Sequence, residues 1–392
     1  MISIRSVSKR YVHGEIAVDD LSLDVEEGEL CILVGPSGCG KTTTLKMVNR
    51  LIEPTSGAIL IDGQNVLEIN PVQLRRRIGY VMQQGGLFPH QRVAENVGVV
   101  PRLLGWGKDR IRSRVHELLE LVGLEPASYE RRYPHELSGG ERQRVGVARA
   151  LGGDPPVLLM DEPFGAVDPV TRGRLQQEFL ELQGTLNKTV MFVTHDIQEA
   201  VALGSRIAVL SKGAVLEQYD SPQEVLGHPA SPFVADFVGG DRGLQRLGVT
   251  CVELADLTRV PIVAPAMQLG EAFRMMRASD SRFAIVLDGG ERPSGWVPGQ
   301  GAERNGRAEA HGPATRANGA ARRAEDPVAE HLRSIDATVP LGSSLRDALA
   351  LMLQHDDGFV TVVDEERYVG VLTPDDVHAA MRRSIGGEPV EV

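Results

Sequence analysis

The chain has 392 residues, 42% of them hydrophobic and 24% charged, a composition typical of folded proteins with about two to three domains. The net charge of −11 argues against a protein that binds nucleic acid as its substrate. The cysteines, Cys31, Cys39 and Cys251, are too scattered for a disulfide framework or a metal cluster. No apolar run approaches the roughly 20 residues of a membrane span, so if the chain works at a membrane, we expect it to dock onto another protein there.

The phosphate-binding motif is the first strong signal along the chain. An apolar run, Leu30–Val34, leads into a loop that fits G-x-x-x-x-G-K-[ST], and a helix is expected from Thr43 to Leu51. Backbone N–H groups in such a loop and the helix N-terminus hold phosphate, while Lys41 would neutralise the outer phosphates. The Thr42 hydroxyl would bind Mg²⁺. The loop residues expected to contact a nucleotide are Gly35, Pro36, Ser37, Gly38, Cys39, Gly40, Lys41, Thr42 and Thr43.

The remaining pattern of this region predicts an α/β fold. Alternating strands are expected at 2–4, 21–25, 58–61 and 78–82, and an amphipathic helix at 109–122. Two apolar runs without alternation, 157–160 and 190–193, predict strands buried on both faces of a parallel sheet, with a helix over 170–186 between them. We therefore expect an open, mostly parallel sheet with an antiparallel edge, whose ligands gather at the carboxyl ends of the strands.

Polar side chains follow several of these strands. Asp161 and Glu162 end a buried strand, where adjacent carboxylates are costly without a cation. Asp161 would hold Mg²⁺, and Glu162 would accept a proton from an attacking water. The alternative is an Asp that caps a helix with Glu in its first turn.

Three further residues are candidates for the same site. His195 follows a strand and could bond the γ-phosphate or the attacking water, although a lone histidine is usually structural. Gln83 could bind Mg²⁺ or water, or could be an ordinary loop residue. Tyr11 could stack on a base, or could only cover the edge of the domain.

A second glycine-containing turn, Leu137–Gln143, precedes an expected helix over 143–151. Ser138 is a good helix N-cap, and that is the simple interpretation. Ser138, Gly139 and Gly140 also place N–H groups and a hydroxyl at a helix N-terminus, where an anion can bind. Two phosphate sites in one chain suggest a nucleotide shared between two copies.

The C-terminal part predicts two small units of similar layout, residues 247–297 and 334–385, each with a strand, a helix and a strand pair. Between them, residues 298–329 are rich in Gly, Ala, Arg and Glu and predict a flexible linker or disordered insertion. Its arginines could contact lipid or nucleic acid, but a solvated tether fits the composition better.

Over residues 1–240 the sequence resembles the ATP-binding cassette (ABC) ATPases, which carry the phosphate loop, Gln83, the 137–143 signature, the 157–162 strand, Asp168 and His195 in this order. The resemblance implies a P-loop NTPase domain with a helical subdomain, and the cofactors ATP and Mg²⁺. It also implies a homodimer closed around two ATP molecules, in which Ser138, Gly139, Gly140, Gln143 and Asp168 contact the ATP of the opposite protomer.

Finer motifs resemble importers of osmoprotectant quaternary amines: residues 83–90, 164–172 and 233–239. The C-terminal units resemble the tandem CBS domains that such ATPases carry. The second unit ends in Gly370-Val371-Leu372-Thr373-Pro374-Asp375-Asp376, where Thr373 and Asp376 match the residues that bind a regulatory adenine nucleotide. The first unit ends in Gly295-Trp296-Val297-Pro298 and lacks both residues, so any nucleotide effector is limited to one half-site.

The sequence thus predicts the ATPase subunit of an importer for glycine betaine, choline, carnitine or proline betaine. It would lie at the cytoplasmic face of the membrane beneath integral permease subunits, and would serve an extracytoplasmic substrate-binding protein only indirectly. Two alternatives remain: the ATPase of a sugar or other small-solute importer, and a soluble cassette protein of DNA repair or translation.

Overall fold

The computed structural model describes residues 1–12, 14–82, 86–165, 167–289, 291–299, 324–355 and 358–384. The chain forms two compact units, Met1–Arg242 and Gly243–Val392, so the first unit ends two residues beyond the expected position 240. Gln83 and the central part of the expected linker, with its arginines, lie outside the described residues.

The first unit is built on a mixed sheet with the strand order β10-β9-β3-β8-β7-β6. Strands β3 (Leu30–Val34), β7 (Val157–Asp161) and β8 (Thr189–Thr194) are buried along their whole length. They pair in parallel with each other and with β6 (Ile78–Val81) and β9 (Arg206–Ser211), and β10 (Val215–Asp220) adds an antiparallel edge. This arrangement confirms the predicted mostly parallel sheet, because strands covered on both faces are apolar throughout.

A second, antiparallel sheet has the order β2-β1-β4-β5. Its strands are β1 (Ile2–Arg10), β2 (Ile16–Val25), β4 (Ser56–Ile61) and β5 (Gln64–Asn65). In β2, buried and exposed residues alternate toward the end of the strand, as expected where one face packs on a core and the other meets solvent. Apolar residues of both sheets form one shared core.

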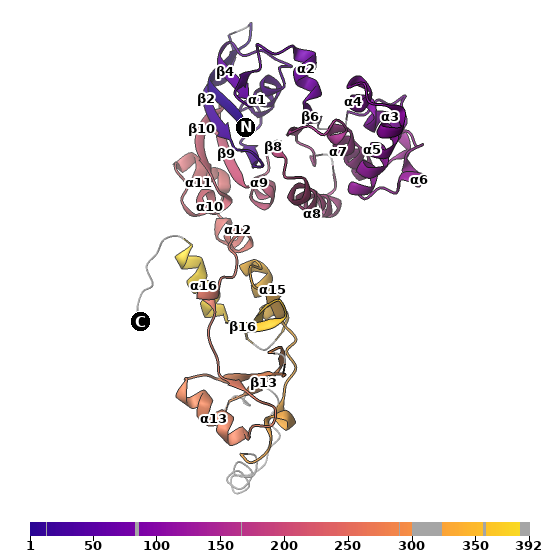
Figure 1. Ribbon diagram of the computed structural model, residues 1–392. Helices are drawn as coiled ribbons and strands as arrows, with labels where there is room; N and C mark the ends of the chain where they lie inside the picture. The colour runs from indigo at the N-terminus through magenta and orange to yellow at the C-terminus, as the bar shows by residue number, and fades with distance from the viewer. Residues whose placement is uncertain are drawn as a thin grey trace. The chain divides into compact units, whose positions relative to one another are not determined.

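Helices surround the sheets of the first unit, and one group of them, α3–α6, lies together beside α7 (Figure 1). This group forms the helical subdomain that the resemblance implied. The helices are α1 (Lys41–Val48), α2 (Pro71–Arg76), α3 (Val93–Val97), α4 (Val99–Leu103), α5 (Lys108–Leu121), α6 (Pro126–Tyr129), α7 (Gly139–Leu151), α8 (Pro169–Leu186), α9 (Ile197–Leu203), α10 (Pro222–Gly227) and α11 (Pro232–Val238).

The second unit contains two small sheets of the same design. Each sheet begins with a strand that pairs in parallel with the next one, which then pairs antiparallel with a third. The elements are α12 (Arg242–Val249), β11 (Ile262–Val263), α13 (Leu269–Ala278), β12 (Phe283–Leu287), β13 (Pro293–Pro298), β14 (Thr338–Pro340), α15 (Leu345–Gln354), β15 (Val360–Asp364), β16 (Arg367–Leu372) and α16 (Pro374–Arg383).

The two halves of this unit divide the chain differently from the expected ranges. Residues after α12, expected in the first half, pack on the second: Val252 lies in the second core, and Thr258 pairs with Val371. Conversely, Val328 falls within the expected linker, residues 298–329, but is fully buried in the core of the first half. The segment before β11 therefore packs on the second half, and the segment before β14 packs on the first half. A duplication pattern that follows the order of the sequence does not reveal this exchange.

Aromatic side chains join the two halves. The rings of Phe283 and Phe359 stack with centroids 4.1 Å apart, and Trp296 meets Phe359 edge-on at 5.5 Å. Ile285 and Val371 complete this shared cluster and are fully buried. Such ring pairs add stabilisation beyond the area they bury, so the halves form one module.

Candidate nucleotide site

Three adjacent strands bring the predicted residues to one edge of the sheet. Strand β8 lies between β3 and β7, and its register places Val34 beside Thr194 and Val193 beside Asp161. Parallel strands end at the same edge, so the phosphate loop, the carboxylates and His195 follow one another there. The structure thus brings together residues that are up to about 160 positions apart in the chain.

The phosphate loop, Gly35–Gly40, is fixed by close backbone approaches. Gly40 has a φ of 117°, and a Cβ atom there would lie 2.3 Å from the Ala17 carbonyl oxygen. At Gly35 a Cβ atom would lie 2.1 Å from the Leu210 carbonyl oxygen. Glycine is required at both positions, because a real Cβ atom never approaches a carbonyl so closely.

Lys41 is the first residue of α1, and its side chain turns back over the loop. It is 5% exposed, and its Nζ donates to the carbonyl oxygens of Gly35 at 2.7 Å and Pro36 at 3.0 Å. The ammonium group is therefore held over the loop by backbone acceptors, in the place where its charge can meet a phosphate. The burial of Lys41 over the loop supports its predicted role at the phosphates.

Two of the predicted magnesium ligands, Thr42 and Asp161, are in direct contact. Thr42 Oγ1 donates to Asp161 Oδ1 at 2.8 Å, across 119 residues of sequence. Tyr80 donates to the other carboxylate oxygen of Asp161 at 3.5 Å, and burial followed by the nearby Asp161 charge raises the Tyr80 pKa. A hydroxyl and a carboxylate oxygen fit Mg²⁺, which prefers oxygen ligands and keeps several sites for water and phosphate. Tyr80 was not predicted, because nothing in the sequence pairs β6 with β7.

Glu162 and His195 face each other at the same edge. His195 Nδ1 lies 3.4 Å from Glu162 Oε1, and the Glu162 side chain is 22% exposed. Glu162 has a left-handed φ of 44°, and its N–H donates to the Val193 carbonyl at 3.0 Å. Such a conformation costs free energy in a non-glycine residue and marks functional positions. The alternative of a simple helix cap is not what forms here, since the next helix, α8, is capped by Asp168.

The 137–143 turn is a helix N-terminus with a reciprocal cap. Ser138 is the N-cap of α7, its Oγ accepts from the Glu141 N–H at 3.3 Å, and its own N–H donates to Glu141 Oε2 at 2.7 Å. Tyr129 from α6 donates to Glu141 Oε1 at 2.6 Å. This hydrogen bond, followed by that of the Ser138 backbone, lowers the Glu141 pKa to about 2. Ser138 and Gly139 are exposed, so the helix N-terminus is open to a ligand.

The other residues expected to contact the opposite ATP divide into two kinds. Asp168 is exposed and caps α8 by accepting from the Thr171 N–H at 3.0 Å. Gln143 is different: its side chain is 5% exposed and lines a pocket between α7 and α8. Tyr11 is 39% exposed at the end of β1, where its N–H bonds to the Glu15 carbonyl at 2.9 Å.

In the second half of the C-terminal unit, Asp376 already has partners. Its Oδ2 accepts from the Thr373 N–H at 2.8 Å and hydroxyl at 2.7 Å, and its Oδ1 accepts from Thr258 at 2.9 Å. Thr373 and Asp376 thereby form a capping box at the start of α16. A nucleotide would compete with these bonds for the carboxylate.

Comparison with known proteins agrees with this geometry. The sequence matches the ABC transporter family over residues 18–165 and the CBS domain family over residues 328–383. The chain is 44% identical to the glycine betaine/carnitine/choline transport ATP-binding protein OpuCA of Bacillus subtilis, over 95% of this chain and 94% of that protein. It is 45% identical to the osmoprotectant import ATP-binding protein OsmV of Salmonella typhimurium, over 96% and 94%.

Solved structures of cassettes match the first unit. The dimeric ABC transporter cassette MJ0796 is 36% identical with a TM-score of 0.52, over 57% of this chain and 99% of that one. The same cassette as a post-hydrolysis dimer with ADP and Pi matches with a TM-score of 0.51 at 35% identity. The chain therefore belongs to the ABC transporter family, among the ATP-binding proteins of osmoprotectant importers. Within the described ranges, no helix is long and apolar enough to cross a membrane.

Proposed function

We propose that this chain hydrolyses ATP to drive the import of quaternary-amine osmoprotectants such as glycine betaine, choline, carnitine or proline betaine. The observation that supports it most strongly is identity of 44–45% over about 95% of the chain with OpuCA and OsmV, which carry these substrates or osmoprotectants in their names. The assembled nucleotide site supports the energy-coupling part of the proposal. Sugar import, the alternative, has no comparable support from these relatives.

In the proposed site, phosphate binding, magnesium binding and proton transfer are divided among different side chains. Lys41 and the loop N–H groups hold the phosphates, and Tyr11 stacks on the adenine. Thr42, Asp161 and Gln83 hold Mg²⁺, which supplies charge neutralisation at the phosphates. Glu162 takes the proton of the attacking water, and His195, 3.4 Å away, orients the Glu162 carboxylate and bonds the γ-phosphate.

The proposed working unit is a homodimer. Ser138, Gly139, Gly140 and Asp168 are presented at two helix N-termini, α7 and α8, with Ser138, Gly139 and Asp168 exposed. The dimeric cassette structures support their use across an interface. Gln143 is buried, so we exclude it from the proposed contacts with the opposite ATP. The membrane partners are integral permease subunits, which place the chain at the cytoplasmic face of the membrane.

The decisive experiment is transport by the complex reconstituted in proteoliposomes with its permease subunits and ATP. We expect ATP-dependent uptake of glycine betaine, choline or carnitine, and none of maltose or glucose. Uptake of a sugar without any quaternary amine would establish the alternative importer. Co-purification with ribosomes or DNA and no membrane partner would favour the non-transport alternative.

We further propose that the C-terminal unit regulates the ATPase in response to ionic strength or an adenine nucleotide. The match to the CBS domain family over residues 328–383 supports this role. Removal of residues 243–392 should leave ATPase activity but abolish its dependence on salt between about 0.1 and 0.5 M, a range over which the Debye length falls from about 10 Å to about 4 Å. An unchanged salt response in the truncated chain would reject the regulatory role.

A further inference from the structure

Helices α8 and α9 both begin beside a segment that the proposed mechanism uses. The loop before α8 ends at Asp168, which is the N-cap of that helix. The turn before α9 contains His195, followed by the N-cap Asp196. Side chains of the two helices contact each other close to these N-termini. Such contacts can fix the loop and the turn relative to each other.

The first contact centres on Glu199 of α9, which is 7% exposed. Gln176 of α8 donates to Glu199 Oε1 at 3.0 Å. Thr194, the residue before His195, also hydrogen-bonds the Glu199 carboxylate, and its Oγ1 accepts from the Asp196 N–H at 3.1 Å. Burial raises the pKa of Glu199, whereas the bonds from Thr194 and Gln176 favour its ionised form. The carboxylate therefore connects α8 to the backbone turn that carries His195.

The second contact is made by Arg172, in the first turn of α8. Its Nη2 donates to the Val167 carbonyl oxygen at 3.1 Å, in the loop directly before Asp168. Its Nη1 lies 3.8 Å from Asp196 Oδ2. One guanidinium group thus contacts both the loop that presents Asp168 and the turn that follows His195.

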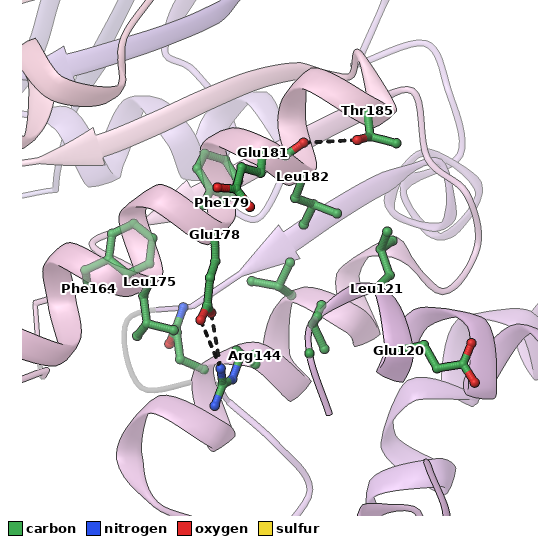
Figure 2. A pocket seen from close by; sticks show the side chains of 14 residues that line it. Glu120, Leu121, Arg144, Phe164, Leu175, Glu178, Phe179, Glu181, Leu182 and Thr185 are labelled. Carbon is green, nitrogen blue, oxygen red and sulfur yellow. Dashed lines mark hydrogen bonds and ion pairs between the residues drawn. The ribbon is translucent and has the colours of Figure 1, made fainter. Parts of the chain in front are cut away.

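The remainder of α8 is packed on two other elements. Phe179 meets Phe164 of the preceding loop and Phe192 of β8, with ring centroids 6.3 Å and 6.4 Å away. On the side toward α7, Glu178 pairs with Arg144, as Figure 2 shows. Close-packed interiors transmit a displacement instead of absorbing it, so a shift of the loop before α8 would reach α9.

We propose that Gln176 and Arg172 are positioning residues that connect the loop presenting Asp168 to the turn presenting His195. The inference rests on the proposed homodimer, in which Asp168 contacts the ATP of the other copy. Closure of the other copy on this loop would then set the position of His195 beside Glu162. Neither Gln176 nor Arg172 is among the proposed nucleotide contacts, so both act through His195.

An exchange of the buried pair tests the first contact. Gln176→Glu places a second carboxylate against Glu199, and kcat for ATP hydrolysis at pH 8 should fall at least about tenfold, because a charge-assisted hydrogen bond is replaced by repulsion. ATP binding by the single chain should be unchanged. The double variant Gln176→Glu/Glu199→Gln restores an amide–carboxylate bond with the partners reversed, and should recover most of the rate. Gln177→Glu is the matched control, since Gln177 is exposed and bonds to Glu181 of the same helix.

The second contact is tested in the same assay. Arg172→Gln should lower kcat about fivefold, the scale of about one lost hydrogen bond, without changing ATP binding. Arg174→Gln should hydrolyse ATP as the wild type does, because Arg174 is on the same helix but is 64% exposed and pairs with Glu178. Equal rates for the two arginine variants would remove Arg172 from the proposal.

A background without His195 separates positioning from damage to the fold. In single-turnover assays, Gln176→Glu or Arg172→Gln added to His195→Ala should lower the rate less than about twofold further, because residues that act through His195 lose their effect once it is absent. Losses that multiply in these double variants would overturn the proposal, as would a normal rate for Gln176→Glu or no recovery in the exchanged pair.

Light scattering with ATP distinguishes failure of this inference from failure of the proposed homodimer. If the chain dimerises and Gln176→Glu hydrolyses ATP at the wild-type rate, only the connection between α8 and α9 is refuted. If the wild type hydrolyses ATP while it stays monomeric, the homodimer is refuted and this inference with it.

Discussion

The two glycine-containing helix N-termini of the first unit, at α1 and α7, show how differently two anion sites can be built. The phosphate loop stands behind a fully buried strand, and Gly40 presses against the Ala17 carbonyl. The α7 terminus is exposed, and a Cβ atom at Gly139 would meet nothing within 4 Å. Folding alone shapes the phosphate loop, whereas the α7 terminus is an exposed surface that we propose meets the nucleotide of another copy.

The largest expected effect comes from a substitution that blocks the exposed N-terminus of α7. Gly139→Glu fits the fold but places a carboxylate where the triphosphate of the other copy is proposed to lie. We expect ATPase activity to fall to background while a single chain still binds ATP, because like charges repel at close range. ATPase assays and ATP titration measure the two effects separately, and Gly139→Ala is the control. Normal hydrolysis by Gly139→Glu would show that α7 does not face a nucleotide.

At the sheet edge that carries the phosphate loop, Glu162→Gln removes the proposed proton acceptor but leaves the loop unchanged. The rate of ATP hydrolysis should fall at least about a hundredfold, the usual scale for a lost general base. ATP binding and ATP-dependent dimerisation should persist, as measured by titration and by light scattering. A near-normal rate would remove Glu162 from the mechanism.

The next effect concerns the free energy of unfolding, and it compares a glycine-to-alanine substitution in the phosphate loop with one at the N-terminus of α7. Gly40→Ala should lower the free energy of unfolding by about 2 kcal/mol, because it forces a left-handed φ and a clash with the Ala17 carbonyl. Gly139→Ala should change it by less than about 0.5 kcal/mol, since that position is open. Urea unfolding of the two variants gives the comparison. Equal losses would contradict the difference drawn between the sites.

The smallest effect concerns the capping box of α7, which Ser138 and Glu141 form. The Glu141 pKa is lowered to about 2 in the folded chain by bonds from Tyr129 and Ser138, so its ionised form stabilises the fold. This contribution is present above the unfolded pKa and is lost as the pH falls from about 4.5 towards 2. Because Glu141 is only partly buried and solvent screens its charge, Glu141→Gln should cost only about 1 kcal/mol at neutral pH.

Chemical denaturation at neutral pH and near pH 4 checks this prediction. The difference between wild type and Glu141→Gln should shrink at the lower pH, where part of the wild-type advantage is lost. Glu125→Gln, an exposed cap position of α6 without a side-chain cap bond, is the control. A difference that is constant with pH would assign the effect to packing instead of charge.

Much of the nucleotide site could be predicted from the sequence because strand ends have a fixed meaning in a parallel sheet. Asp161, Glu162 and His195 each follow an apolar run, and the structure places them at one edge with the phosphate loop. The ABC motifs then supplied the family, which the relatives confirm. Gln83 lies outside the described residues and remains a prediction.

The remaining features depend on contacts that local patterns do not contain. Tyr80 reaches Asp161 only because β6 happens to neighbour β7, and Tyr129 reaches Glu141 only through the fold of the helical subdomain. Gln143 is the last residue of the 137–143 signature, yet a helix turns successive side chains by about 100°, so its side chain is buried although Ser138 and Gly139 are exposed.

The stacked rings of Phe283 and Phe359 bear on the integrity of a cut chain. Phe283 precedes residues 300–323 in the sequence and Phe359 follows them. Each half contributes one of these rings to an apolar cluster that both halves share. If a protease severed the backbone between these halves, the fragments would stay together through this buried aromatic contact. Each fragment alone would expose large apolar surface, and aggregation would follow separation.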